Sequence, residues 1–214
     1  MPDIDFARVF ITFIVLLFSL TVHETAHAWT ASRLGDQTAR LLGRVSLNPI
    51  VHADIVGTVL FPLLAIIGNM PLIGWAKPVP VLVKNLRRGR RDYVLVAAAG
   101  PASNLLLAVL ASIGLGLITV SPMRVGEPNV SAPMASLLST AILTNVLLAV
   151  FNMIPIPPLD GGNVLGGLLP QPLAAKYDAL IRPYGFILLY ALILTRGFEY
   201  VVIPPARFIL SWLQ

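Results

Sequence analysis

The sequence predicts an all-α polytopic membrane protein. Of its 214 residues, 57% are hydrophobic and only 12% are charged, whereas soluble domains are roughly 45–50% apolar and about 25% charged. Apolar segments close to the ~20 residues that a helix needs to cross a bilayer recur along the chain. The absence of cysteine excludes disulfides, thiolate metal ligands and a cysteine nucleophile.

Four segments have the length and composition of membrane spans. We expect the first three to form a three-helix core within about residues 6–170, followed by a C-terminal span. A cleaved signal peptide is not expected. Such a peptide begins with a positively charged region, whereas here the negative charges of Asp3 and Asp5 exceed the positive charge of Arg8, and no cleavage site follows. No repeat or soluble accessory domain is found, so residues 1–214 are interpreted as a single integral membrane domain. The expected spans cover about residues 6–30, 93–120, 134–154 and 183–202.

Two further segments lie between the first and second spans. Residues 55–75 are apolar but are interrupted by glycines and prolines, which favours a re-entrant or in-plane segment over a fifth span. Residues 75–83, WAKPVPVLV, alternate β-branched residues with prolines, as in a short β-like edge. Such an edge can hold a substrate as an added strand, although a simple linker has the same pattern.

The basic residues indicate how the chain is oriented. Six of the 15 lie between Lys77 and Arg91, and three more, Arg33, Arg40 and Arg44, precede them. The positive-inside rule places both stretches in the cytoplasm and explains them without a nucleic-acid partner, with anionic membrane lipids as the expected contact. The first and third spans then both end on the cytoplasmic side.

The stretch HETAH places ionisable groups at the cytoplasmic end of the first span. His23 and His27 are one helical turn apart, so both imidazoles can reach one ion, and zinc accepts nitrogen ligands in a tetrahedral arrangement. Glu24 projects beside the ion, where a glutamate can deprotonate a zinc-bound water. Two chance helix-lining histidines are the alternative, but acidic residues are costly in a bilayer.

A hydrolytic zinc site needs a third protein ligand and one open position. Asp160, in NMIPIPPLDGG after the third span, is the best candidate, although Asp-Gly is also a common turn dipeptide. Asn152 can donate a hydrogen bond to a developing oxyanion or simply join two helices. His52 is interpreted as a gate or helix cap rather than a fourth ligand, and Asp54 as a helix cap.

The stretch GPASN opens the second span. Gly100, Ala102 and Ser103 allow neighbouring helices to pack closely, which is the simpler interpretation. Asn104 is the one residue of this stretch that can instead face the site as a polar partner. The sequence leaves both possibilities open.

These motifs resemble the site-2 proteases, a family of intramembrane zinc metalloproteases. HETAH matches the family's H-E-x-x-H, and NMIPIPPLDGG matches its N-x-x-P-x-x-P-x-D-G form. The region NPIVHADIVGT and the segment WAKPVPV are similar to those of small bacterial and archaeal members that lack PDZ and CBS domains. The resemblance extends from about residue 6 to residue 170.

The resemblance implies a function and a site. His23, His27 and Asp160 would bind one zinc ion per chain, with Glu24 as the general base and Asn152 as a second catalytic group. The substrates would be transmembrane segments of other proteins, cut in regulated intramembrane proteolysis by a multi-pass protein of the cell membrane whose active site faces the cytoplasm.

Two other classes of function use the same residues differently. A metal ion transporter or channel would use the His, Glu and Asp cluster as transit ligands, but such a path needs polar groups across both leaflets. The external halves of these spans are almost wholly apolar. A catalytically inactive assembly protein would have no need of Glu24. The sequence does not indicate an oligomeric state.

Overall fold

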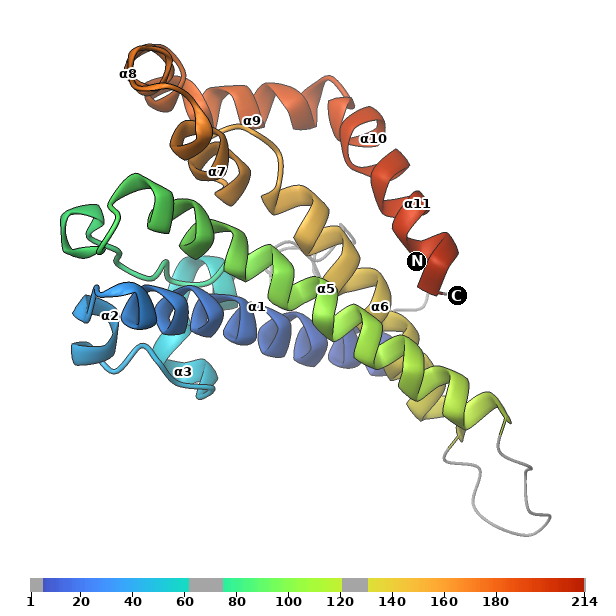
Figure 1. Cartoon of the computed structure of the whole chain (residues 1–214). Coiled ribbons are helices and arrows are strands. Elements are labelled where there is room, and N and C mark those ends of the chain that lie inside the picture. The colour runs from blue at the N-terminus through green and yellow to red at the C-terminus, as the bar shows by residue number, and fades with distance from the viewer. Residues whose placement is uncertain (1–5, 62–74, 121–130, 214) are drawn as a thin grey trace, which may run out of the picture.

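The computed structural model of the chain describes residues 6–61, 75–120 and 131–213, and every regular element in these ranges is a helix. Three long helices form the centre of the structure: α1 (Phe6–Leu34), α5 (Arg90–Val120) and α6 (Ser131–Asn152). They pack against one another, with α5 in contact with both of the others (Figure 1). Each is long and apolar enough to cross a membrane. The prediction of the first three spans is therefore confirmed, to within a few residues at each end.

Small side chains line the contacts between these helices. Ala28 and Ala31 of α1 and Ala108 of α5 are fully buried, and Ala149 of α6 is almost so. Large apolar side chains such as Phe18, Leu106 and Leu143 point outward and remain exposed. Small residues let membrane helices approach closely, while exposed apolar side chains suit a lipid environment. With its four candidate spans, the chain is a multi-pass membrane protein.

The fourth expected span, residues 183–202, is wrong in its bounds. The candidate span runs over Gln171–Leu194 instead, and comprises α8 (Gln171–Leu180), the short η3 (Arg182–Tyr184) and α9 (Gly185–Leu194). The helix ends there because Arg196 adopts a left-handed conformation, with a φ of 56°. Gly197 follows, and a Cβ there would lie 2.6 Å from Cδ1 of Leu192 and 3.1 Å from the Leu192 carbonyl oxygen.

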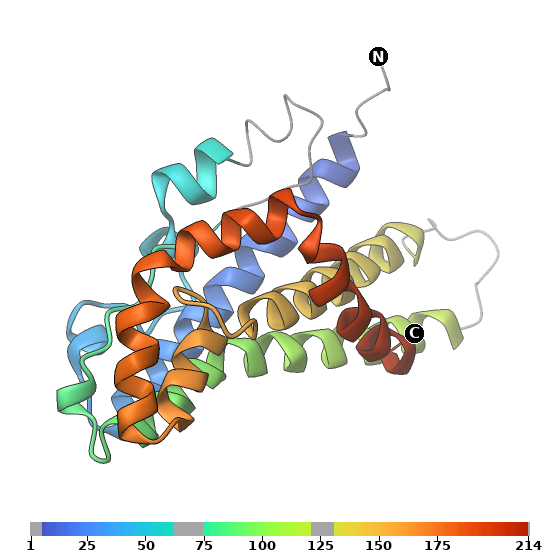
Figure 2. The same ribbon diagram turned by 90° about the horizontal axis from the view of Figure 1, so that it is seen from above.

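After this break the chain folds back towards the core. It continues as α10 (Gly197–Val201) and α11 (Ile203–Leu213), and α11 packs against α6 and α5 (Figures 1 and 2). Ala206 joins Ala108 and Val146 in one buried apolar cluster. The C-terminal helices are thus attached to the core through α11.

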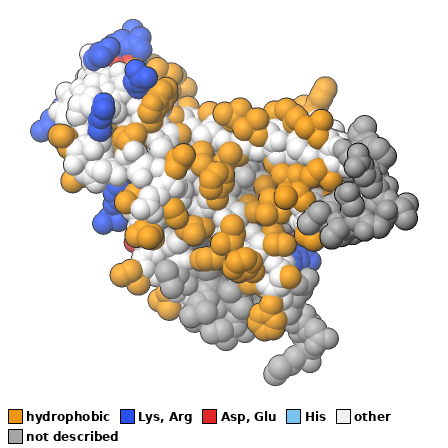
Figure 3. Space-filling model, turned by 90° about the horizontal axis from the view of Figure 1, so that it is seen from below, with side chains coloured by type: hydrophobic (Ala, Val, Ile, Leu, Met, Phe, Trp, Pro, Cys, Tyr) orange, Lys and Arg blue, Asp and Glu red, His pale blue; other side chains and the backbone are white. Residues whose placement is uncertain are grey.

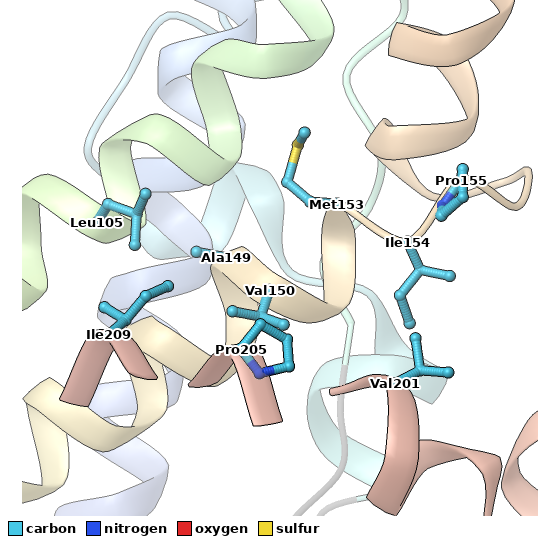
Figure 4. Close-up of a pocket in the computed structure, with 9 residues that line it drawn as sticks. All are labelled: Leu105, Ala149, Val150, Met153, Ile154, Pro155, Val201, Pro205 and Ile209. Carbon is cyan, nitrogen blue, oxygen red and sulfur yellow. The ribbon is translucent and has the colours of Figure 1, made fainter. Parts of the chain in front are cut away.

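An apolar cavity of about 310 Å³ lies between these C-terminal helices and the core (Figure 4). Ala149 and Val150 of α6 line one side, and Val201 and Pro205 line the other. Met153, Ile154 and Pro155, which lead from α6 towards Asp160, complete its wall. The cavity therefore borders the loop that leads to Asp160, one of the predicted ligands.

Short helices connect the long ones on the side where α1 ends. They are α2 (Thr38–Leu41), α3 (Pro49–His52), the π-helix η1 (Ile55–Leu60), the 3₁₀ turn η2 (Val83–Asn85) and α7 (Asp160–Leu168). The predicted cap at Asp54 is confirmed, because its carboxylate accepts hydrogen bonds from the N–H groups of Val56 and Gly57. Most of the proposed re-entrant segment, residues 62–74, lies outside the described residues.

The expected β-like edge does not form a strand. Residues 76–82 are irregular, and the described part of the chain contains no β-strand. Pro78 and Pro80 have no N–H to donate, and the neighbouring N–H groups are already bonded elsewhere. Lys77 donates to the His52 carbonyl and Val79 to Glu24. Strand addition along this segment would therefore lack most of its backbone donors.

A buried carboxylate holds this segment against the end of α1. Asp36 is fully buried and accepts hydrogen bonds from the N–H of Leu82 at 2.7 Å and the amide of Asn85 at 3.0 Å. It also accepts from the N–H and the hydroxyl of Thr38, at 3.1 and 2.5 Å. Burial by itself raises the pKa of Asp36, but these hydrogen bonds outweigh it and hold the pKa below its usual value.

Replacing Asp36 tests this anchor. We expect Asp36→Ala to destabilise the protein by about 1–3 kcal/mol, because buried donors lose their acceptor. Since the folded pKa is depressed, this stabilisation is fully present above the ordinary pKa of ~3.9 and is lost as the pH falls through the lower folded value. Thermal unfolding in detergent, followed by circular dichroism against pH, measures it. The exposed Glu199→Gln is the control, and an equal effect of both changes would contradict the anchor.

Candidate metal centre

Three predicted ligands converge where α1 meets the first residue of α7. The Nε2 atoms of His23 and His27 lie 3.0 Å apart. The Asp160 Oδ2 atom lies 3.1 Å from Nε2 of His23 and 3.4 Å from Nε2 of His27. Both histidines are buried, and the Asp160 side chain is only 15% exposed. Among the described residues, this is the only group of three or more such side chains that could hold a metal ion.

The glycines beside Asp160 allow it to reach this position. Asp160 begins helix α7 rather than a simple turn. A Cβ at Gly161 would lie 2.2 Å from the Met153 carbonyl oxygen, and one at Gly162 would lie 2.5 Å from the nitrogen of Pro157. The loop after α6 can therefore pack directly on the first turn of α7. The pair of glycines is needed for this close approach.

A third glycine makes room on the opposite side. A Cβ at Gly100 of α5 would lie 2.4 Å from Nε2 of His27 and 2.5 Å from Nε2 of His23. The expectation that Gly100 permits close packing is confirmed. The contact is more specific than helix packing, because the space that a side chain would fill lies against the two ligand atoms.

The other ring nitrogens show which atoms are available to a metal. Nδ1 of His27 donates to the Val96 carbonyl at 2.7 Å, and Nδ1 of His23 donates to Oδ1 of Asn104 at 2.6 Å. A neutral imidazole that carries its proton on Nδ1 has a lone pair on Nε2. Both lone pairs therefore face each other and the Asp160 carboxylate, an arrangement that favours a bound cation.

The donor set fits zinc. Bond lengths of ~2.0–2.2 Å in a tetrahedral site place neighbouring ligand atoms about 3.3 Å apart, close to the separations found here. Asp160 Oδ2 is buried and has no hydrogen-bond donor among the described residues. Two nitrogens and one oxygen leave a fourth position open, as in catalytic zinc sites.

Two other predicted site residues have partners of their own. Glu24 lies on α1 beside His23 and is half-buried, and its Oε2 accepts a hydrogen bond from the Val79 N–H at 3.0 Å. Asn152 donates through Nδ2 to the Leu148 carbonyl of its own helix at 3.0 Å. The catalytic roles of Glu24 and Asn152 stay predictions.

His52 lies apart from the cluster. It is buried at the end of α3, and its Nε2 donates to the Ser46 carbonyl at 2.8 Å. This contact ties α3 to the loop before it, which agrees with a structural role rather than a fourth ligand.

Asn145 belongs to none of the sequence motifs. This residue lies on α6, is 2% exposed, and accepts a hydrogen bond from Asn104 at 2.8 Å. A polar side chain within an apolar span indicates a hydrogen-bond partner inside the bundle, because burying an unpaired amide in a membrane is costly. Asn104 does face the site, as one of its two interpretations allowed.

A bundle of apolar helices around a buried two-histidine, one-carboxylate centre defines a membrane-embedded metalloprotein. The model of peptidase family M50 matches residues 115–192. A relative from Bacillus subtilis (strain 168), named "Putative zinc metalloprotease YwhC", is 38% identical over 191 residues, which are 89% of this chain and 83% of that protein. The chain belongs to peptidase family M50 and is a zinc metalloprotease of that family.

Two mycobacterial proteins are also similar to this chain. Both are named "Putative zinc metalloprotease Rip2". The one from Mycolicibacterium smegmatis (strain ATCC 700084 / mc(2)155) is 32% identical over 84% of this chain and 64% of its own length. The one from Mycobacterium tuberculosis (strain ATCC 25618 / H37Rv) is 32% identical over 88% of this chain and 68% of its own length. No solved structure matches this chain.

The space at Gly100 can be tested directly. We expect Gly100→Ala to abolish metal binding, because the added methyl group would occupy the space against both Nε2 atoms. Gly116→Ala is the matched control, since it lies on the same helix and its Cβ would meet nothing within 4 Å. Elemental mass spectrometry of the detergent-purified proteins measures zinc per chain. Full zinc in Gly100→Ala would show that the metal does not lie between these histidines.

Proposed function

We propose that this chain is an intramembrane protease that hydrolyses peptide bonds within or near transmembrane helices of other membrane proteins, in regulated intramembrane proteolysis. One observation carries the proposal: His23, His27 and Asp160 lie together where the membrane helices α1 and α5 meet the short helix α7. A protease with its metal ligands in the membrane part of the fold suits a substrate bond at the same depth.

His23, His27 and Asp160 would hold one zinc ion per chain. Bound there, zinc supplies a Lewis acid that lowers the pKa of a water molecule to ≈ 7 and polarises the carbonyl of the scissile peptide. Asp160 contributes the one negative charge of the ligand set, and it stands at the N-terminus of α7, where the helix dipole favours an anion.

Glu24 would act as the general base and then as the general acid. Its carboxylate takes a proton from the attacking water and transfers it to the amine nitrogen as the peptide C–N bond breaks. The hydrogen bond from Val79 holds one carboxylate oxygen, Oε2, which leaves Oε1 to the water. Asn152 would stabilise the oxyanion through the second N–H of its amide, since the first donates to the Leu148 carbonyl.

Apolar surfaces near the site support a transmembrane substrate. The cavity of Figure 4 borders Met153 and Ile154, which directly follow Asn152. Large exposed apolar side chains cover much of the outer surface of the helices (Figure 3). An apolar helix can therefore approach, through the membrane, the loop that leads to Asp160.

The distribution of charge supports a site that faces the cytoplasm. Most of the Lys and Arg side chains drawn in Figure 3 lie towards one end of that face. The basic stretch from Lys77 to Arg91 includes the start of α5, and Arg90 also bonds to the Gly166 carbonyl of α7. Under the positive-inside rule, this end of a cell-membrane protein lies in the cytoplasm, beside anionic lipid headgroups.

Glu24→Gln separates proteolysis from metal transport. We expect it to lower the cleavage rate of a verified membrane substrate by about 10²–10⁴-fold, because the amide cannot accept the proton of the water. Zinc content should stay stoichiometric, since Glu24 is not a ligand. Cleavage by purified protein in detergent or liposomes measures the first effect and elemental analysis the second. Glu199→Gln, on α10, is the control; cleavage that survives Glu24→Gln would contradict the proposed mechanism.

Asp160→Ala tests whether the two distant motifs form one site. We expect zinc per chain to fall sharply, because two histidines alone leave the ion without its carboxylate ligand. Elemental mass spectrometry compares this variant with wild type and with Glu199→Ala. If Asp160→Ala still binds one zinc ion per chain, Asp160 is not a ligand and the metal is held by the histidines without it.

A further inference from the structure

A chain of buried amides extends behind His23 into the centre of the bundle. Nδ1 of His23 donates to Oδ1 of Asn104 on α5, and Nδ2 of Asn104 donates to Oδ1 of Asn145 on α6. Nδ2 of Asn145 donates in turn to the Ala141 carbonyl at 2.9 Å. Asn104 and Asn145 are 0% and 2% exposed. One hydrogen-bonded chain thus joins all three core helices to the metal centre.

The direction of this chain is set at its far end. The Ala141 carbonyl can only accept a hydrogen bond, so Asn145 must present its NH₂ group there and its oxygen to Asn104. Asn104 then presents its oxygen to His23 and its NH₂ group to Asn145 at 2.8 Å, with a longer bond of 3.4 Å to the Ser19 carbonyl of α1. The bond to Asn145 is the shorter of the two that hold this orientation. The Asn104 oxygen requires the proton of His23 on Nδ1, which leaves the Nε2 lone pair towards the metal.

The two histidines differ in how they are held. His27 donates to the backbone carbonyl of Val96, whose polarity is fixed. His23 donates to a side-chain amide, which can rotate by 180° and exchange its oxygen for NH₂. A rotated Asn104 would offer a donor to Nδ1 of His23 and favour the proton on Nε2, where it would block the ligand atom. Only His23 therefore needs a second residue to fix its partner.

We propose that Asn104 and Asn145 are positioning residues for zinc: Asn145 locks the orientation of Asn104, and Asn104 keeps the Nε2 lone pair of His23 available to the metal. The inference rests on the proposed zinc site and adds two residues that do not touch the metal. Partners behind a ligating histidine typically change metal affinity by 10–100-fold when they are removed.

A purely structural role makes a different prediction. Amides that only join membrane helices contribute to the stability of the bundle, and their removal lowers stability whether or not metal is present. The locking role predicts instead that Asn145 affects zinc affinity through Asn104 alone. A double-mutant cycle on zinc affinity separates the two roles.

The experiment measures the zinc dissociation constant of the full-length protein in detergent by competition with a chelator of known affinity. We expect Asn104→Leu to weaken zinc binding by about 10–100-fold and Asn145→Leu to weaken it less or equally. The double variant should bind zinc as Asn104→Leu does, because Asn145 has nothing left to orient. Thr140→Val, on the exposed part of α6, is the control and should bind as wild type does.

A second pair of variants gives a sharper test. Asn104→Asp keeps an acceptor for His23 and has no NH₂ group that rotation could bring there. In the wild-type background, Asn145→Leu should lower zinc affinity. In the Asn104→Asp background, the same change should not lower it. Melting temperatures of the zinc-free proteins show how far each change alters the fold without metal.

The outcomes are distinct. Two results would overturn the locking role. The first is that Asn104→Leu and Asn145→Leu lower zinc affinity additively in the double variant. The second is that Asn145→Leu lowers zinc affinity equally in the wild-type and Asn104→Asp backgrounds. Unchanged zinc affinity in every Asn variant would overturn the inference and leave the proposed zinc site intact. A wild-type protein that binds no zinc would overturn both, whereas cleavage that persists in Glu24→Gln would overturn the proposed catalytic mechanism alone.

Discussion

The structure depends on bringing two imidazole lone pairs and a carboxylate oxygen within 3.4 Å of one another in the buried centre of an apolar bundle. Without a cation, such a cluster brings electron-rich atoms together where little water can screen them. The close approaches around it serve this convergence. Gly100 removes a side chain from the space beside the histidines, and Gly161 and Gly162 let the loop after α6 deliver Asp160.

Helix α5 is the scaffold of the site, although it supplies no ligand. It provides the bare backbone at Gly100, the Val96 carbonyl that orients His27 and the Asn104 side chain that orients His23. It also contacts α1, α6 and α7. A ligand pair on one helix is thus aligned by its neighbour, and the orientation of each imidazole is decided by groups that never reach the metal.

The position of Glu24 depends on a different part of the chain. Its carboxylate is held by Val79, which belongs to an irregular segment anchored to Asp36, just after the end of α1, and to α3 through the His52 carbonyl. The prolines of this segment leave it few backbone donors, and those of Lys77, Val79 and Leu82 are used within the protein. The segment therefore supports the predicted base rather than offering an edge for strand addition.

The sequence by itself determined the three core spans, the pairing of His23 with His27 and the cap at Asp54, because apolar length, helical spacing and capping are local properties. The positive charge of distant loops also predicted, through the positive-inside rule, that Asp160 lies at the same membrane depth as the two histidines. Only the tertiary structure decided that Asn104 and Asn145 lie behind His23, that Gly100 faces the ligand atoms, and that residues 76–82 form no strand. These features depend on which atoms meet across helices far apart in the chain, and no local pattern specifies those contacts.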